Sequence, residues 1–319
     1  MASQAVPETE DPSFEEMFSK LGLTGRYMLV DIGANLTNKK FARDLDAVVQ
    51  RAKDSGVAKI MVTGTSVQGS KDALRLTRLF PGTLYSTAGL HPHDAKSWIS
   101  DRGSSGEGSY EALKNLAVNN PEVVAIGECG LDFNRNFSPP DVQVEVFEKQ
   151  VQLGIELKKP LFIHERDAHV ELMSVLNKYE DQLPPTVIHC FTGNKEQVQV
   201  YLSKGFYIGL TGFLWKDKTA DGVRSILKSK LIPLNRLLVE TDAPFMYPNT
   251  RASSLPDEVK KSLTEQSITY HQRYCTFQRN EPCSLPITVE IISSFMGCKA
   301  EEVALRTTFN AVKLFGLNS

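Results

Sequence analysis

Four apolar stretches of this chain each lead directly into side chains that can bind a metal ion. The runs are followed by Glu128, by His164, by His189, and by the pair Glu240 and Asp242. If the runs are strands of a parallel β/α barrel, their carboxyl ends meet at one mouth, so residues distant in sequence can share an ion. Two imidazoles with carboxylates are the ligand set of a zinc or manganese hydrolase rather than of a structural thiolate site. The sequence therefore predicts a metal-dependent hydrolase.

Glu128 is the first of these candidates. It stands between two glycines, in Gly127-Glu-Cys-Gly130, which allow close backbone approach around an acid. A carboxylate there could bridge two metal ions. The alternative is a buried ion pair with Arg135 or Arg166, which has equal weight when Glu128 is considered alone. The coincidence with the other strand-end ligands favours the metal.

Asp242 is the candidate general base. A carboxylate that touches both a metal and its water usually takes the proton of that water in such hydrolases. Aspartate is also a common helix N-cap, which is the alternative interpretation. Glu240, two residues earlier, shares the orientation of Asp242 only if the strand continues that far.

His91 follows the third apolar run, in His91-Pro-His93-Asp94. Its imidazole is a candidate to protonate or hydrogen-bond a phosphate oxygen at the mouth. The same four residues also fit a capped loop start with Asp94 as N-cap. That interpretation is compatible with a functional His91 and could account for His93 completely.

Aromatic and basic residues combine in the loops after the last two runs. Phe213, Trp215 and Lys216 follow the seventh run, and Phe245 follows the eighth. Stacking on such rings contributes ~1–3 kcal/mol per base, although aromatic residues near barrel loops are usually core. The pattern suits a single-stranded end better than a duplex. We assign substrate contact to Arg166, Lys216 and Trp215.

Strand-like and helix-like stretches alternate along the chain and predict a closed TIM (β/α)8 barrel. The expected strands lie near residues 27–32, 59–62, 84–88, 123–127, 161–163, 186–188, 206–209 and 237–239, and amphipathic helices are expected at 44–55, 70–79, 142–157 and 167–178. Residues 244–286 exceed an ordinary connection and predict an excursion at the mouth with a helix over 257–267. Closing helices are expected at 287–296 and 301–314.

Composition narrows the class of protein. The 319 residues, 41% apolar and 23% charged, can form one large globular domain, and no stretch is apolar enough to span a membrane. A net charge of −2 means that a polyanionic substrate must be held locally. There is no P-loop, no GxGxxG after the first strand and no GxSxG.

The chain is expected to consist of a short N-terminal tail and one barrel domain. Residues 1–26 predict an acidic tail with a short helix over 14–21, before a barrel domain over 27–319, and 101–108 predicts a flexible loop. Five cysteines without a CxxC pair argue against a disulfide framework. The tail lacks the features of a signal or transit peptide, so we expect a cytosolic or nuclear protein.

With these motifs in place, the chain resembles the TatD family of metal-dependent deoxyribonucleases over about residues 30–317, and is most similar to the branch that contains the bacterial TatD exonuclease. The resemblance implies a TIM-barrel phosphodiesterase with Glu128, His164, His189 and Asp242 as metal ligands and Asp242 activating water. The segments that carry it are Asp31–Leu36, Thr87–Asp94, Val124–Phe133, His164–His169, Ile188–Gly193, Glu240–Pro244 and Arg279–Pro282.

One departure affects the metal. Most of the family has a His-x-His pair where this chain has Gly33 and Asn35, although the TatD branch shares the substitution. With fewer imidazoles, the preference moves from Zn²⁺ toward Mg²⁺ or Mn²⁺, which accept oxygen and water ligands. Residues 255–276 and the acidic tail look like additions to the bacterial pattern and could serve a protein partner.

We therefore expect a nuclease that removes nucleotides from the 3′ end of single-stranded DNA, with RNA as a further expected substrate and with Glu128, Asp242 and His91 as catalytic residues. Two alternatives stay open. The same barrel and ligands could activate water against small amides or esters. The missing histidines also allow a weakly active barrel that serves as a scaffold.

Overall fold

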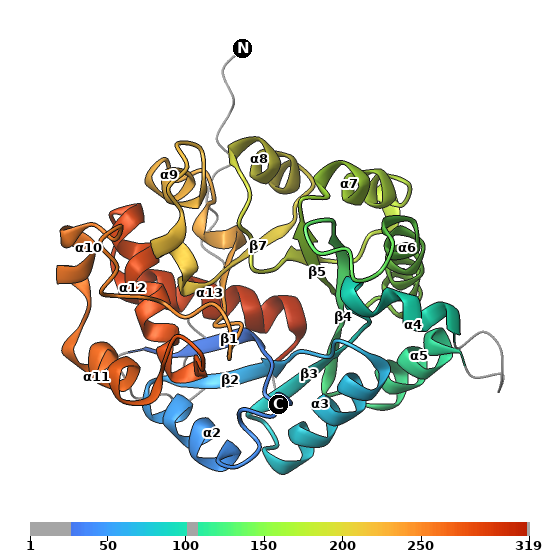
Figure 1. Cartoon of the computed structure of the whole chain (residues 1–319), viewed down its shortest axis with the longest axis horizontal. Coiled ribbons are helices and arrows are strands. Elements are labelled where there is room, and N and C mark those ends of the chain that lie inside the picture. Colours follow the sequence, from blue (N-terminus) through green and yellow to red (C-terminus); the bar gives the residue numbers. More distant parts are fainter. Residues whose placement is uncertain (1–26, 101–107, 318–319) are drawn as a thin grey trace.

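Eight parallel strands form the centre of the protein in the computed structural model, which describes residues 27–100 and 108–317 (Figure 1). Each strand is hydrogen-bonded to the next in sequence order, and a bridge between Ala34 and Ala243 joins the loop after the last strand to the first strand. The predicted TIM barrel is confirmed. The strands are β1 (Leu29–Ala34), β2 (Val57–Val62), β3 (Leu84–Ala88), β4 (Val123–Asp132), β5 (Leu161–Arg166), β6 (Thr186–Ile188), β7 (Tyr207–Leu210) and β8 (Leu237–Val239).

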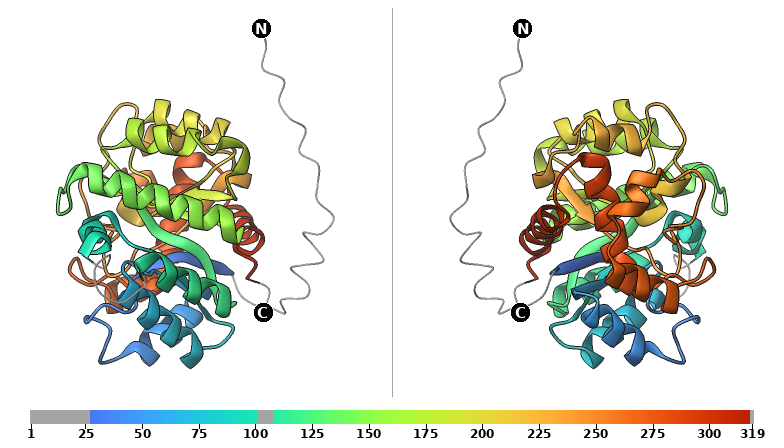
Figure 2. Two further views of the ribbon diagram at one scale, coloured as in Figure 1. Left: turned by 90° about the vertical axis from the view of Figure 1, so that its right-hand side faces the viewer. Right: turned by 90° about the vertical axis from the view of Figure 1, so that its left-hand side faces the viewer.

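Helices surround the barrel, and α6 lies along the outside of β4 (Figure 2). Their apolar faces pack on the strands, most of whose residues are buried on both sides of the barrel wall. No helix of the described residues is long and apolar enough to cross a membrane. The helices between strands are α2 (Leu45–Asp54), α3 (Val67–Leu79), α4 (Ala95–Ser100), α5 (Ser109–Asn119), α6 (Pro140–Leu157), α7 (His169–Asn177), α8 (Lys195–Ser203) and α9 (Val223–Lys228).

Strands β4 and β5 are longer than predicted. Cys129 to Asp132 pair with Ile163 to Arg166, so the ladder continues past the expected ends at Gly127 and Ile163. A Cβ at Gly127 would collide with the Phe162 carbonyl oxygen, so glycine is needed for this approach. Glu128 and His164 therefore lie within strands, not after them.

The segment after β8 forms the expected excursion with two helices instead of one. The helices are α10 (Asp257–Ser262) and α11 (Glu265–Tyr274). The single helix predicted over 257–267 is wrong, because Thr264 interrupts it and caps α11 by accepting a hydrogen bond from the Ser267 N–H. Helices α12 (Leu285–Met296) and α13 (Ala300–Phe315) close the chain as predicted. The tail 1–26 and loop residues 101–107 lie outside the described residues.

An apolar cluster fills the inside of the barrel below the mouth. Ile32, Met61, Phe162 and Leu238 belong to it and come from four different strands. All four side chains are fully buried. The Phe162 ring stacks on the imidazole of His189, with ring centroids 4.4 Å apart. The core thus forms the floor of the site.

Candidate metal centre

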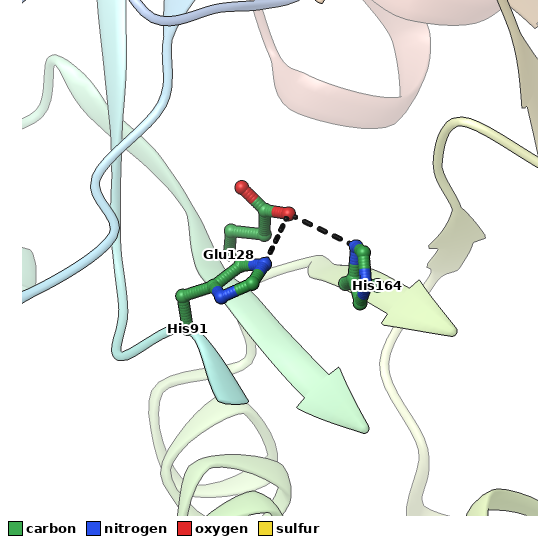
Figure 3. Close-up of side chains that lie close together, drawn as sticks. All are labelled: His91, Glu128 and His164. Carbon is green, nitrogen blue, oxygen red and sulfur yellow. Dashed lines mark ion pairs between the residues drawn. The ribbon is translucent and has the colours of Figure 1, made fainter. Parts of the chain in front are cut away.

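Glu128 is the centre of a cluster of imidazoles. Its Oε1 lies 3.2 Å from His91 Nε2, 3.3 Å from His164 Nδ1 and 2.9 Å from His189 Nε2. Figure 3 shows the first two pairs converging on one oxygen. Within the described residues, no ion pair joins Glu128 to Arg135 or Arg166, so that alternative is wrong. Glu128, His164 and His189 come together as the strand pattern predicted.

Asp132 is a second acid of the cluster, which the sequence analysis missed. Its Oδ2 lies 2.8 Å from His93 Nε2 and 3.4 Å from His164 Nε2. His93 is therefore part of the site and is not explained by loop capping alone. The signal was present: residues four apart in an extended strand face the same side, so Asp132 shares the face of Glu128 once β4 reaches it.

Glu240 supports the site from below. It is fully buried, its Oε2 lies 3.2 Å from His189 Nδ1, and its Oε1 accepts a hydrogen bond from the Cys190 N–H. A carboxylate on the second ring nitrogen fixes the orientation of a metal-binding histidine and raises its basicity. Glu240 is thus placed to orient His189 and does not line the cleft.

Asp242 reaches the cleft from the loop after β8. Its backbone is left-handed, with φ of 48°, and its N–H donates to the Gly33 carbonyl at 2.8 Å. Asn35 Nδ2 donates to Asp242 Oδ1 at 3.0 Å. The alternative role of Asp242 as a helix N-cap is wrong, because the next helix, α10, begins only at Asp257. Asn35 instead holds the side chain of Asp242 in place.

The cluster gives its two principal carboxyls opposite proton affinities. Burial opposes ionisation of Glu128, but His91, His189 and His164 hold its pKa well below the usual value. Burial and the charge of Glu128 raise the pKa of Asp242 well above the usual value. Two carboxyls whose pKa values are driven apart in one cleft are typical of an acid–base site.

The donor set fits a divalent metal ion. Ligand atoms of His91, Glu128 and His164 all lie within 4.8 Å of one another. His164 Nε2 is buried and, apart from the 3.4 Å contact with Asp132 Oδ2, makes no hydrogen bond in the described structure. A site of imidazoles and carboxylates can bind Zn²⁺, Mn²⁺ or Mg²⁺. More nitrogen ligands favour Zn²⁺, and more oxygen ligands favour Mn²⁺ or Mg²⁺.

The side chains of this candidate metal centre open into a cleft of about 590 Å³. Arg166 and Lys216 line it as predicted, and Lys216 Nζ lies 5.0 Å from the centroid of the Phe213 ring. Trp215 does not line it: the ring is partly buried against the core, and its Nε1 donates to the Tyr247 carbonyl at 2.9 Å. The predicted stacking role of Trp215 is therefore unsupported.

Residues 30–316 match the family model described as TatD related DNase. The chain is 42% identical to a 3′-5′ ssDNA/RNA exonuclease TatD of Erwinia billingiae, over 91% of this chain and 99% of that protein. It is 40% identical to the protein of the same name from Escherichia coli K12, with the same coverage.

Solved structures agree with the fold. A TatD family hydrolase from Entamoeba histolytica superposes with a TM-score of 0.76 at 26% identity, over 91% of this chain and 98% of that one. A TatD homologue from Escherichia coli K12 gives 0.73 at 26% identity, over 92% and 99%. With the matched segment covering the strands that carry the cluster, this chain belongs to the TatD-related DNase family.

Proposed function

We propose that this protein is a metal-dependent deoxyribonuclease that removes nucleotides from the 3′ end of single-stranded DNA, with RNA as a second substrate. The observation that carries the proposal is the convergence of three imidazoles on Glu128 at the floor of an open cleft. The polarity and the two substrates follow the names of relatives at about 40% identity.

We propose Glu128, His164, His189 and Asp242 as ligands of Mg²⁺ or Mn²⁺, with Zn²⁺ as the alternative. A metal ion held there would supply Lewis-acid polarisation of a phosphoryl oxygen and an activated water. Asp242, held by Asn35, is placed to accept the proton of the attacking water.

The remaining polar groups of the cleft hold the substrate. Burial lowers the pKa of His91, which favours the neutral imidazole, and a neutral ring can hydrogen-bond a phosphate oxygen. Arg166 and Lys216 offer positive charge to the neighbouring backbone phosphates. A cleft of this size with basic and aromatic residues suits a nucleic-acid strand better than a small amide or ester. A protein partner at residues 255–276 stays a prediction.

Digestion of a single-stranded oligonucleotide labelled at one end tests the function. With Mg²⁺ or Mn²⁺, the 5′-labelled strand should shorten stepwise into a ladder, and the 3′-labelled strand should release its label at the first cut. A chelator should abolish both reactions. Internal cuts independent of the ends would contradict the polarity, and no cleavage with any ion would contradict the nuclease itself.

Asp242→Asn should lower kcat by about 10²–10⁴-fold, because the amide keeps its shape but cannot accept a proton. Initial rates on a 3′-labelled strand at saturating Mn²⁺ measure the change. Oligonucleotide binding in chelator is the control and should be unchanged. A variant that retains the full rate would show that another group accepts the proton.

Gly33→Ala should lower metal affinity by about 10–100-fold without touching a ligand. A Cβ at this position would collide with the Glu240 carboxylate, which holds His189. Displacing a group that orients a metal ligand typically lowers metal affinity by about 10–100-fold. Calorimetric titration with Mn²⁺ measures the effect. Gly108→Ala is the matched control, because no atom of the described residues lies within 4 Å of its added methyl group; equal affinity in both variants would contradict the role of Glu240.

A further inference from the structure

Phe137 is a solvent-exposed aromatic residue in the loop after β4, beside the candidate metal centre. It follows β4, 61% of it is exposed, and its ring meets that of His93 edge to face at 4.8 Å. The next residue, Ser138, is fully buried and donates to the His93 carbonyl at 2.9 Å. Arg135 N–H donates to Asp132 Oδ1 at 2.8 Å, which fixes the loop on its other side. The ring is thus held in place without being covered.

Phe245 is a second exposed ring at the mouth. It lies three residues after Asp242, lines the cleft and is 50% exposed. Its N–H donates to the Asp242 carbonyl at 2.9 Å, so its backbone is tied to that candidate ligand. Because the eight strands follow one another in sequence order round a closed barrel, the loops after β4 and β8 stand on opposite sides of the mouth. The two rings therefore flank the metal-binding cluster.

Positive charge accompanies both rings. Arg135, two residues before Phe137, lines the cleft, and so do Arg166 and Lys216. Exposed aromatic rings next to cations are the combination with which proteins bind single strands, since every base offers a stacking face. Bases inside a duplex do not offer that face, so rings at these positions select unpaired nucleotides.

We propose that Phe137 and Phe245 are two base-stacking platforms that hold the unpaired bases on either side of the scissile phosphate. The inference rests on the proposed nuclease function and extends it: the rings, rather than Trp215, read the single-stranded character of the substrate. Each ring contacts a different nucleotide, because Phe245 lines the cleft, whereas Phe137 lies outside the lining against His93, on the opposite side of the mouth.

Binding of abasic oligonucleotides tests the proposal. The probe is a 5′-fluorescein thymidine oligonucleotide, intact or with one tetrahydrofuran residue at the last or the penultimate 3′ position. Its affinity for the full chain in chelator is measured by fluorescence anisotropy, so cleavage does not interfere. Phe137→Leu and Phe245→Leu remove the rings, and Phe137→Tyr and Phe245→Tyr retain them. Leu79→Ala is the control, because Leu79 is 60% exposed at the end of α3, where the chain returns to the opposite face of the barrel.

Each leucine variant should bind the intact probe about 5- to 150-fold more weakly, the range that corresponds to one stacked base. The tyrosine variants and Leu79→Ala should bind like the wild type. With an abasic residue at one position, Phe137→Leu should bind the probe as tightly as the wild type does. With the abasic residue at the other position, the same should hold for Phe245→Leu.

The proposal is overturned if the leucine variants bind like Leu79→Ala, if both respond to the same position, or if no probe binds. Failure of the nuclease function looks different. In that case the position-dependent binding is present, but the wild type does not cleave the intact probe when Mg²⁺ or Mn²⁺ is added.

Discussion

Glu128→Gln should abolish metal binding and lower kcat/KM by about 10³-fold or more. The carboxylate is the meeting point of His91, His164 and His189, so replacing it removes a ligand and the charge that holds the three imidazoles together. Loss of one such electrostatic group commonly costs about 10²–10³-fold in rate, and loss of the ion removes the activated water as well. Calorimetric Mn²⁺ titration and single-strand digestion measure the two effects.

Glu165→Gln is the matched control for this prediction. Glu165 also lines the cleft on β5, but its carboxylate accepts hydrogen bonds from the Ala168 N–H and the Tyr201 hydroxyl instead of contacting the imidazoles. It should bind Mn²⁺ and cleave like the wild type. Circular dichroism shows whether each variant is folded. Cleavage by a folded, metal-free Glu128→Gln protein would overturn the assignment of the site.

The barrel and the centre of the site were predictable because they depend on the spacing of apolar runs along the sequence and on the residues that follow each run. Parallel strands buried on both faces are continuous apolar runs, and the residue at the end of each run faces the mouth. This rule was enough to bring together Glu128, His164, His189 and Asp242, and it needed no side-chain geometry.

Contacts that depend on side-chain direction were not predictable. Asp132 was missed because the predicted strand ended at Gly127, whereas the close approach of Gly130 to the His164 backbone lets the ladder continue to Asp132. Trp215 was assigned to the substrate because an aromatic loop residue looks the same in sequence whether its indole N–H faces the cleft or the Tyr247 carbonyl. Tertiary packing decides between these, and one sequence does not record it.

The last large effect concerns stability, at the junction of α2 with the excursion after β8. Glu281 is fully buried, and Arg51 Nε and Nη2 donate to its two carboxylate oxygens at 2.8 and 2.9 Å. Arg279 pairs with Glu281 and also with Asp44, at 2.7 Å for the latter. The segment Arg279–Pro282, which is part of the resemblance, thus holds a buried ion-pair network together.

Arg51→Met should lower the free energy of unfolding by up to about 3–5 kcal/mol, because it leaves a buried carboxylate without its bidentate partner and with Arg279 to offset part of its charge. Urea denaturation monitored by circular dichroism measures the loss. Arg75→Met is the control. The Arg75 side chain is 71% exposed, and its contact with Asp72 is long, at 3.8 Å, so its removal should lower the free energy of unfolding by at most about 1 kcal/mol. Equal losses in the two variants would contradict a special role for the buried pair.

The double variant Arg51→Met/Glu281→Leu distinguishes two causes of the lost stability. One is the loss of the attraction between Arg51 and Glu281, and the other is the cost of a buried Glu281 carboxylate that has lost its bidentate partner. If the buried charge causes the loss, removing Glu281 as well should restore part of the stability of Arg51→Met. The neighbour of Glu281 connects this junction to catalysis, since the Asn280 N–H donates to the Pro244 carbonyl at 3.0 Å and Asn280 Nδ2 donates to the Thr241 carbonyl at 3.2 Å. Both carbonyls flank Asp242. Arg51→Met should therefore weaken Mn²⁺ binding although Arg51 does not line the cleft, and a destabilised variant with unchanged Mn²⁺ affinity would show that the junction supports the fold alone.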